Sequence, residues 1–354
     1  MNNKLRTMLL ILVVFSIVLT GCSTKKETNV PEINEEVIQE ESFSYEGLAK
    51  NPLTGLWIDE EVASRRPVAI MINNIKMALP QSGISEADLI YEVLAEGDIT
   101  RLVAIFQELE SEKIGPVRSI RDYYFNISFD HDAIIIHHGG SPQAFEAIKT
   151  LKPSNINTLS GLEGIMTWRD AVRRKQKGML EHSLYTSGDR ILAGWDKVKY
   201  RVERNKDSKP FFNFSEEEII PIGKEANEVI IPFSKTYVSE FIYDEQLHLY
   251  KKSHHKNSHI DENNYKQLEF KNIIVQFTDI RLIPGDAEGR RDVKLIGEGK
   301  GLYITNGMAK EITWSKKNHN TPTVFKDESG KELIINTGKT YIGIFPSNKE
   351  IELR

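Results

Sequence analysis

The first 22 residues constrain this chain more than any other segment does. Two basic residues precede a nearly unbroken apolar run over residues 8–18, and Leu19-Thr20-Gly21-Cys22 ends the segment. A basic start, a short apolar core and small residues before a cut site predict a secretory signal peptide over residues 1–21. The apolar run is also too short to cross a bilayer comfortably. Leucine, two small residues and cysteine form a lipobox, which predicts cleavage before Cys22 and attachment of a lipid to its thiol.

The lipid on Cys22 determines where the rest of the chain folds. Cys22 is the only cysteine of the 354 residues, and a polar segment follows it. This argues against an ordinary signal peptide with a cysteine nearby, and against a buried core cysteine. The predicted anchor carries two acyl chains and holds the protein on the extracytoplasmic face of the cell membrane. Because the thiol is acylated, the exported part must fold without disulfides. Residues 22–50 are predicted to be the lipidated N-terminus and a flexible tether.

Charge and length bound the possible partners and the number of domains. Without residues 1–21 the chain has 44 Lys and Arg against 51 Asp and Glu, a formal charge of −7. A nucleic-acid-binding domain would be basic, so no nucleic-acid partner is expected. Roughly 300 residues follow the tether, more than one ordinary core serves. We therefore predict an α/β domain over residues 51–205 and a mostly-β domain over residues 206–354.

Three short apolar runs indicate the sheet of the N-terminal domain. Residues 67–72, 101–107 and 133–137 are mostly apolar, and runs of that length fit strands covered on both faces. Ser141-Pro142 places a capping residue before a proline at the first helical position, which predicts a helix after the Gly139-Gly140 turn. Strand, turn and helix in this order predict an α/β domain whose mixed sheet is flanked by helices.

The chain after about residue 200 has a different pattern. Short apolar or alternating segments, with turn signals between them, predict a mostly-β domain. Asn306-Gly307 is a strong hairpin-turn signal between two of these segments. The predicted strands cover residues 229–232, 236–243, 246–250, 273–277, 293–296, 301–305, 309–314, 323–325, 332–335 and 340–345.

Polar residues that could carry chemistry gather between Glu92 and Gly140. We expect them at strand ends, where ligands bind in open α/β sheets. Arginine side chains bind phosphate oxygens in a bidentate way, and a carboxylate can hold a Mg²⁺ ion that bridges such oxygens. Backbone N–H groups of the glycine turn and the following helix start would add to an anion site. The candidate residues are Asp98, Arg101, Arg118, Arg121 and Asp122.

The same residues also have a purely structural interpretation. Arg118 with Asp122, and Asp98 with Arg101, would then form surface salt bridges, and for any one residue alone this is the simpler explanation. Arg169 and the nearby Arg173-Arg174-Lys175 extend the positive site, although an exposed basic helix face explains them equally well.

The histidines and possible nucleophiles give weaker signals. His182 precedes an apolar pair and is expected in the core. His254, His255 and His259 lie in a polar stretch, which favours a solvated loop over a metal site. No Gly-x-Ser-x-Gly segment is present, and the single cysteine is used for lipid. Hydrolysis through a serine or cysteine nucleophile is therefore unsupported.

Several segments closely resemble the YerB-like family of bacterial lipoproteins, and the resemblance extends over the mature chain. That family is defined by an uncharacterised pair of domains. The segments are Asn51-Pro52-Leu53-Thr54-Gly55, residues 67–74, Glu96-Gly97-Asp98-Ile99-Thr100-Arg101, residues 115–121 and Thr340-Tyr341-Ile342.

The N-terminal domain is more faintly similar to the LytR-CpsA-Psr phosphotransferases, which transfer wall polymers from polyprenyl-pyrophosphate carriers. Residues 98–101, Ser119-Ile120-Arg121-Asp122 and the Gly139-Gly140 turn follow the order of that family's motifs. This sequence departs from them in having Ile99 between Asp98 and Thr100, and no proline before Arg121.

This second resemblance implies roles for individual residues. Asp98 would hold magnesium and Arg121 would bind the pyrophosphate. Arg169 matches a later arginine of the family less closely, and Arg101 and Arg118 are included by proximity alone. Asp98 or Asp122 would act as the base.

Two functions are therefore expected from the sequence. The first is a membrane-anchored envelope lipoprotein with an arginine-rich site for a polyprenyl-pyrophosphate or wall-polymer ligand. Such a protein would either be a Mg²⁺-dependent glycopolymer phosphotransferase or bind this ligand without transferring it. The second is a non-enzymatic scaffold that holds a protein partner on its β-rich domain. The sequence does not decide whether the protein is an enzyme.

Overall fold

The computed structural model describes residues 44–205 and 209–354. The predicted signal peptide, Cys22 and most of the predicted tether lie outside the described residues. Residues 45–354 form one compact unit. No helix in the described part of the chain is long and apolar enough to span a membrane.

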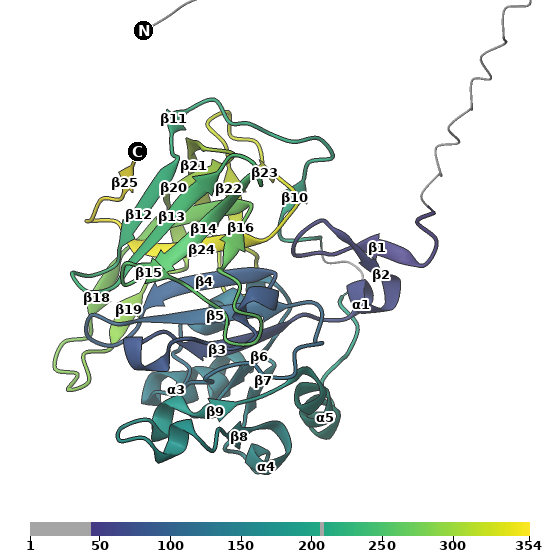
Figure 1. The fold of residues 1–354 in the computed structure, drawn as a ribbon, viewed down its shortest axis with the longest axis vertical. Helices are drawn as coiled ribbons and strands as arrows, with labels where there is room; N and C mark the ends of the chain where they lie inside the picture. Colours follow the sequence, from purple (N-terminus) through teal and green to yellow (C-terminus); the bar gives the residue numbers. More distant parts are fainter. Residues whose placement is uncertain (1–43, 206–208) are drawn as a thin grey trace, which may run out of the picture. The chain divides into compact units, whose positions relative to one another are not determined.

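An 11-stranded mixed sheet is the centre of this unit (Figure 1). Its strands follow in the order β11-β21-β20-β17-β24-β4-β5-β3-β6-β7, and β22 pairs with β21. Their bounds are β3 Val68–Asn73, β4 Leu89–Leu94, β5 Thr100–Phe106, β6 Ile134–His137, β7 Asn155–Asn157, β11 Lys224–Glu225, β17 Asn272–Thr278, β20 Gly297–Thr305, β21 Met308–Lys316, β22 Val324–Lys326 and β24 Thr340–Pro346.

The two domains share this sheet. β24, from the end of the chain, pairs in parallel with β17 on one side and with β4 on the other. The N-terminal domain contributes a mixed sheet with few helices, and the C-terminal domain is mostly strands, as predicted. The domain boundary predicted at residues 205 and 206 adjoins the undescribed residues 206–208 and stays a prediction.

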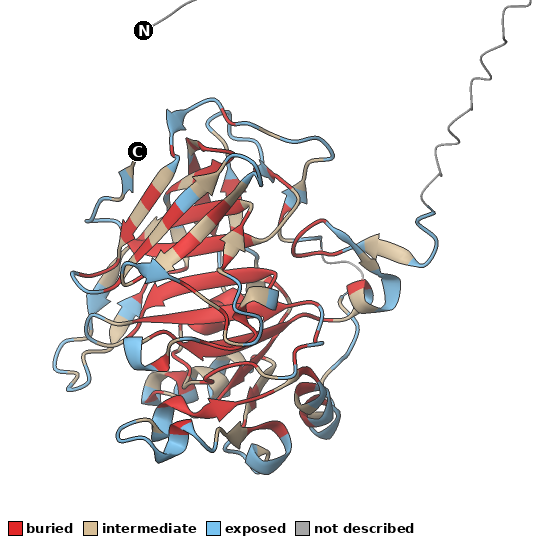
Figure 2. Ribbon diagram, in the orientation of Figure 1, coloured by how far each residue is buried: buried red, intermediate tan, exposed pale blue. Residues whose placement is uncertain are grey.

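Apolar layers cover both faces of the central sheet (Figure 2). Side chains alternate between faces along a strand, so Ile70 packs with α5 and a second sheet, whereas Met71 packs with α2 and α3. The helices are α1 Glu60–Ser64, α2 Tyr124–Asp130, α3 Pro142–Leu151, α4 Glu163–Met166 and α5 Gly188–Val198. The second sheet contains β12 Glu228–Pro232, β13 Val238–Asp244, β14 Leu249–His254, β15 Asn257–Ser258, β16 Glu269–Phe270 and β25 Glu352–Leu353.

Short pairs and turns complete the described fold. Two-stranded sheets join β1 with β2, β8 with β9, β10 with β23, and β18 with β19. Their bounds are β1 Leu48–Lys50, β2 Trp57–Asp59, β8 Trp168–Arg169, β9 Leu184–Tyr185, β10 Asn213–Phe214, β18 Ile280–Leu282, β19 Arg291–Val293 and β23 Ile334–Ile335. Single 3₁₀ turns are η1 Lys76–Ala78, η2 Ile84–Glu86, η3 Arg173–Lys175 and η4 Leu180–His182.

The sequence located three N-terminal strands, one helix and the seven C-terminal strands of five or more residues. The three predicted N-terminal strands are β3, β5 and β6, and every residue of all three is buried. The predicted helix is α3, where the Ser141 hydroxyl accepts a hydrogen bond from the Ala144 N–H and Pro142 takes the first helical position. Strand β4 was missed, and Glu92 lies inside it rather than at a strand end, so that expectation was wrong.

Glu92 is the acceptor of a buried network that joins the two domains. Its Oε2 accepts hydrogen bonds from Ser239 Oγ at 2.7 Å and from Tyr341 OH at 2.8 Å, and lies 3.6 Å from Lys252 Nζ. Its Oε1 accepts from Thr100 Oγ1 at 2.8 Å. Burial acts to raise the pKa of Glu92, but Lys252, His254 and these hydroxyls together hold that pKa below its ordinary value. The carboxylate is therefore charged and fully bonded between strands of both domains.

We expect Glu92→Gln to lower the free energy of unfolding by about 3 kcal/mol, because it leaves the ammonium group of Lys252 buried without its carboxylate. Urea denaturation at pH 7 measures this. The matched control is Glu146→Gln, which removes an ion pair whose side chains are 67% and 74% exposed and should change stability little. A loss below about 1 kcal/mol in Glu92→Gln would contradict the structural role of the pair.

Candidate functional site

Two of the predicted phosphate-binding arginines are held by one carboxylate. Arg101, on β5, donates to Glu96 Oε2 at 3.0 Å and to the Ser119 carbonyl at 2.6 Å, and its side chain is 3% exposed. Arg121 pairs with the other oxygen of Glu96 and donates to the Ile120 carbonyl at 2.7 Å. These contacts bring Arg101 and Arg121 together, as predicted, but they use both side chains to fix the segment that follows β5.

The other two predicted arginines, Arg118 and Arg169, line a cavity of about 410 Å³ that we call the arginine cavity. Arg118 Nη1 lies 3.1 Å from a carboxylate oxygen of Glu181, whose side chain is 69% exposed. The buried Nε of Arg118 has no hydrogen-bond partner among the described residues. Arg169 Nη1 donates to the Leu180 carbonyl at 2.6 Å. The remaining lining residues are Val117, Ser119, His138, Gly139, Gly140, Phe145, Leu159 and Leu184.

The glycine turn after β6 forms one wall of the arginine cavity. Gly139 has a φ of +73°, which favours glycine. A Cβ at Gly140 would lie 3.1 Å from a side-chain carbon of Ile120, so the turn packs closely on the segment that carries Arg121. Helix α3 begins directly after this turn. Gly139 and Gly140 of the turn, Phe145 of α3 and the two arginines thus border the same space.

The charges around the arginine cavity are poorly balanced. The pKa of Arg118 is lowered by burial and then by Arg101, with Arg169 contributing, and only Glu181 opposes this. The pKa of His138 is also lowered by burial, and by Arg169 and Arg118, against Glu163. His138 Nδ1 is hydrogen-bonded with Thr158 Oγ1 at 2.7 Å. An anion in the cavity would offset the mutual repulsion of these cations.

The two predicted catalytic aspartates lie outside the arginine cavity. The Asp98 side chain is 72% exposed and lies 3.6 Å from Arg291. Asp122 lines a smaller cavity of about 210 Å³ with Asn126 and His319, and burial raises its pKa. In the described ranges, no group of three or more His, Cys, Asp or Glu side chains is placed to hold a metal ion. The residues present therefore give no fit for the expected Mg²⁺ around Asp98.

The expected surface salt bridges also have other partners. Arg118 pairs with Glu181 instead of Asp122, and Asp98 approaches Arg291 instead of Arg101. Glu96 and Glu181 are the carboxylates that sequence spacing did not identify, because both pairings depend on tertiary packing.

The prediction of a solvated loop for the three histidines was partly wrong. His254 and His259 are 1% and 2% exposed, so the predicted solvated loop is wrong for them. His259 Nε2 lies 2.6 Å from Gln81 Oε1, and His255 Nδ1 lies 2.9 Å from the Thr236 carbonyl. Because both partners are acceptors, these nitrogens carry the protons. His182, expected in the core, is 7% exposed and bonds with Asn73 at 2.7 Å.

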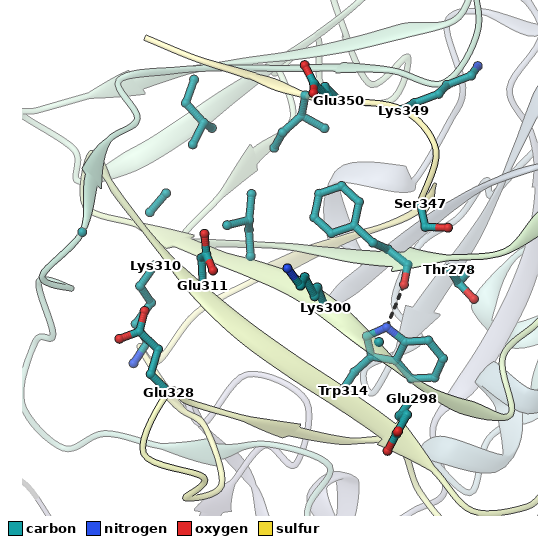
Figure 3. A pocket seen from close by; sticks show the side chains of 18 of the residues that line it. Thr278, Glu298, Lys300, Lys310, Glu311, Trp314, Glu328, Ser347, Lys349 and Glu350 are labelled. Carbon is teal, nitrogen blue, oxygen red and sulfur yellow. Dashed lines mark hydrogen bonds between the residues drawn. The ribbon is translucent and has the colours of Figure 1, made fainter.

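A second open space lies in the C-terminal domain (Figure 3). This groove of about 890 Å³ is lined by both lysines and glutamates, among them Lys300 and Glu311. The Trp314 indole N–H donates to the Phe277 carbonyl at 2.8 Å, so the ring is fixed, and Trp314 is only 2% exposed. Its charges of both signs do not converge on one ligand group, which makes the arginine cavity the stronger candidate site.

Comparison with known proteins assigns the family. Models described as "Protein of unknown function (DUF3048) N-terminal domain" and "C-terminal domain" match residues 53–201 and 229–342. The chain is 34% identical over 300 residues to "Putative lipoprotein YerB" of Bacillus subtilis (strain 168), which covers 84% of this chain and 86% of that protein. This chain belongs to the YerB-like family. A crystal structure of YerB from Bacillus subtilis matches it with a TM-score of 0.76 at 32% identity, over 86% of this chain and 99% of the other.

In this YerB-like protein the two pairs of arginines should respond differently to substitution. We expect Arg101→Ala to lower the free energy of unfolding by about 2 kcal/mol, because it leaves the Ser119 carbonyl without its donor. Arg118→Ala removes a pair with an exposed glutamate and should change stability by less than about 1 kcal/mol. Urea denaturation of both variants tests the difference, and equal losses would assign Arg118 a structural role as well.

Buried histidines of this YerB-like protein should make its stability depend on pH. Burial lowers the pKa of His131 and of His254 to about 3, assisted by Arg204 and by Lys252 respectively. The unfolded chain therefore binds protons below about pH 6.5 that the folded chain does not, and stability falls with falling pH. Between pH 7 and pH 5 each such histidine should remove roughly 2 kcal/mol.

Urea denaturation at these two pH values measures that loss. His254→Asn should reduce the difference between pH 7 and pH 5, whereas substitution of His248, whose side chain is 52% exposed, serves as the control. An unchanged pH dependence in His254→Asn would mean that His254 titrates normally in the folded protein.

Proposed function

We propose that this protein is a lipid-anchored lipoprotein on the extracytoplasmic face of the cell membrane, and that it binds the phosphate or pyrophosphate group of an envelope ligand in the arginine cavity. The lipobox at Cys22 and the recorded name of the YerB relative support the anchor. The observation that carries the ligand is the excess of positive charge around a cavity, where Arg118 and Arg169 face one partly exposed carboxylate, Glu181.

Phosphate suits this cavity for geometric and electrostatic reasons. Arginine forks bind phosphate oxygens, and Arg118 and Arg169 both line the cavity. Phe145 and Leu159 form an apolar part of the same lining. A polyprenyl pyrophosphate or the phosphorylated end of a wall polymer combines these two kinds of chemistry, so these remain the ligand classes we favour.

The geometry supports binding rather than transfer. Neither Asp98 nor Asp122 lines the arginine cavity, so neither predicted catalytic aspartate faces the proposed phosphate; the ionisable side chains that do are Arg118, His138, Arg169 and Glu181. The resemblance to the LytR-CpsA-Psr phosphotransferases rests on sequence motifs alone. The titrations that test the phosphate site are therefore run both with and without magnesium.

A protein partner is the second candidate, and the C-terminal groove is the specific site that favours it. Gly299 and Gly301 lie in its lining, and a Cβ at either would lie within 3 Å of backbone or Trp314 atoms. Glycines keep this wall of the groove low, which would admit an extended peptide chain.

Calorimetric titration of the soluble ectodomain, residues 23–354, tests the proposed phosphate site. We expect inorganic pyrophosphate and a short-chain polyprenyl pyrophosphate to bind, and Arg118→Ala or Arg169→Ala to weaken both by at least about tenfold. Arg281→Ala is the control, because that arginine lies outside the cavity and its side chain is 74% exposed.

Two further results separate a phosphate site from non-specific charge. A bound anion should raise the pKa of His138, which NMR of the imidazole protons would detect, while the signals of buried His131 stay unchanged. Titrations with and without magnesium show whether a metal contributes. A folded wild-type protein that gives no heat with either ligand would exclude the phosphate site and favour the protein partner.

A further inference from the structure

Exposed apolar side chains surround the arginine cavity. Phe145 and Leu159 line it and are 40% and 52% exposed, although both are large and apolar. Leu180, whose carbonyl accepts the hydrogen bond from Arg169, is 54% exposed. We call these three side chains the apolar rim. They come from α3, from the loop after β7, and from η4, so three separate segments present apolar groups beside one cationic cavity.

A basic loop adjoins the apolar rim. Residues 170–179 connect β8 to η4 and carry the exposed cations Arg174, Lys175 and Lys177. Val172, in the same loop, is 71% exposed. The loop is anchored by the Arg173 guanidinium, which donates to the Ala78 carbonyl at 3.1 Å and to the Pro80 carbonyl at 2.6 Å. It therefore presents cations and an apolar side chain from a fixed position next to the rim.

This face differs in charge from the molecule as a whole. The mature chain carries a formal charge of −7, yet cations outnumber the carboxylates around the arginine cavity and the basic loop. The nearby carboxylates are Glu163, Asp170 and Glu181; Asp170 lies 3.4 Å from Lys113, and Glu181 pairs with Arg118. Figure 1 shows α3, β8, β9 and α4 gathered at one end of the described chain, away from the β11 end. Cations and apolar groups are thus concentrated at that end.

Exposed apolar side chains flanked by lysine and arginine are typical of surfaces that lie in a membrane interface. Their apolar groups enter the boundary between headgroups and acyl chains, while the cations contact anionic headgroups. A soluble protein surface has no such need to expose large apolar residues beside buried arginines. The arginine cavity at the centre of this face would receive a phosphate that the bilayer itself presents.

We infer that this face docks on an anionic phospholipid bilayer, with a lipid phosphate in the arginine cavity and the apolar rim in the acyl boundary. The inference rests on the proposed phosphate site for its central contact and adds the source of that phosphate, the membrane surface. Phe145 and Leu159 line the cavity, but Leu180 and the basic loop lie outside its lining, so the two ideas can fail separately.

Vesicle co-sedimentation of the soluble ectodomain, residues 23–354, tests this docking, because that segment contains the compact unit of residues 45–354 and leaves out the predicted lipid anchor. We expect binding to vesicles of phosphatidylglycerol and phosphatidylcholine, and at least tenfold weaker binding to phosphatidylcholine alone. Substituting Phe145, Leu159 and Leu180 together by serine should weaken binding at least tenfold. Lys175→Ala should weaken it about fivefold at low salt.

The control replaces three exposed apolar residues elsewhere, Ile222, Ile242 and Leu247, by serine and should leave vesicle binding unchanged. Lys175 lies outside the cavity lining, so Lys175→Ala should bind inorganic pyrophosphate with unchanged affinity, and circular dichroism checks that the rim variant is folded. Absence of wild-type binding to the anionic vesicles, or equal losses in rim and control variants, would overturn the docking. If pyrophosphate binds while vesicles do not, the docking fails and the phosphate site stands. Vesicle binding without pyrophosphate binding would reject the phosphate site instead.

Discussion

The insertion of β24 between β17 and β4 makes the two domains of this protein one structure. β24 pairs in parallel with β17 over its whole length and with β4 over residues 340–344, and every residue in it is buried. Glu92 on β4 accepts a hydrogen bond from Tyr341 on β24, and Lys252 of the second sheet lies beside the same carboxylate. A buried charge is tolerated only when it is paired and fully hydrogen-bonded. The C-terminal strands must therefore be in place before the N-terminal sheet reaches its native arrangement around Glu92.

The position of the arginine cavity follows from this sheet. β3 and β6 continue it as parallel neighbours, and β6 ends at the turn of His138, Gly139 and Gly140. Glu96 holds Arg101 and Arg121 and so fixes the segment that carries Arg118. One carboxylate thus divides four arginines into a structural pair and a pair that faces the cavity. This division explains why four arginines that the sequence assigned to one site have different environments.

The sequence predicted local structure well and long-range contacts poorly. Strands β3, β5 and β6, the capped start of α3 and the Asn306-Gly307 hairpin depend on side-chain pattern and turn chemistry, which are local. β4 was missed because its pattern contains Glu92, whose burial requires Lys252 from 160 positions further along the chain. The burial of His254 and His259 likewise depends on Gln81 and the neighbouring domain. The sequence alone was enough to predict that the arginines form one group. Distinguishing the structural pair from the pair that faces the cavity required the positions of Glu96 and Glu181 in the fold.

The Glu92 network and the arginine cavity use charge in opposite ways, and this contrast is the basis for assigning a ligand to the second. Around Glu92, hydroxyl and ammonium donors satisfy the carboxylate, and the side chains of Glu92 and Lys252 are both fully buried. Glu92 lines none of the cavities described above. Around Arg118 the partner carboxylate is exposed, one buried N–H has no partner among the described residues, and further cations lower the pKa of both Arg118 and His138. The first arrangement is complete without any added group and contributes stability. The second leaves a buried N–H without a partner among the described residues, which supports the proposed anion, and the apolar rim beside it favours an anion that belongs to a lipid.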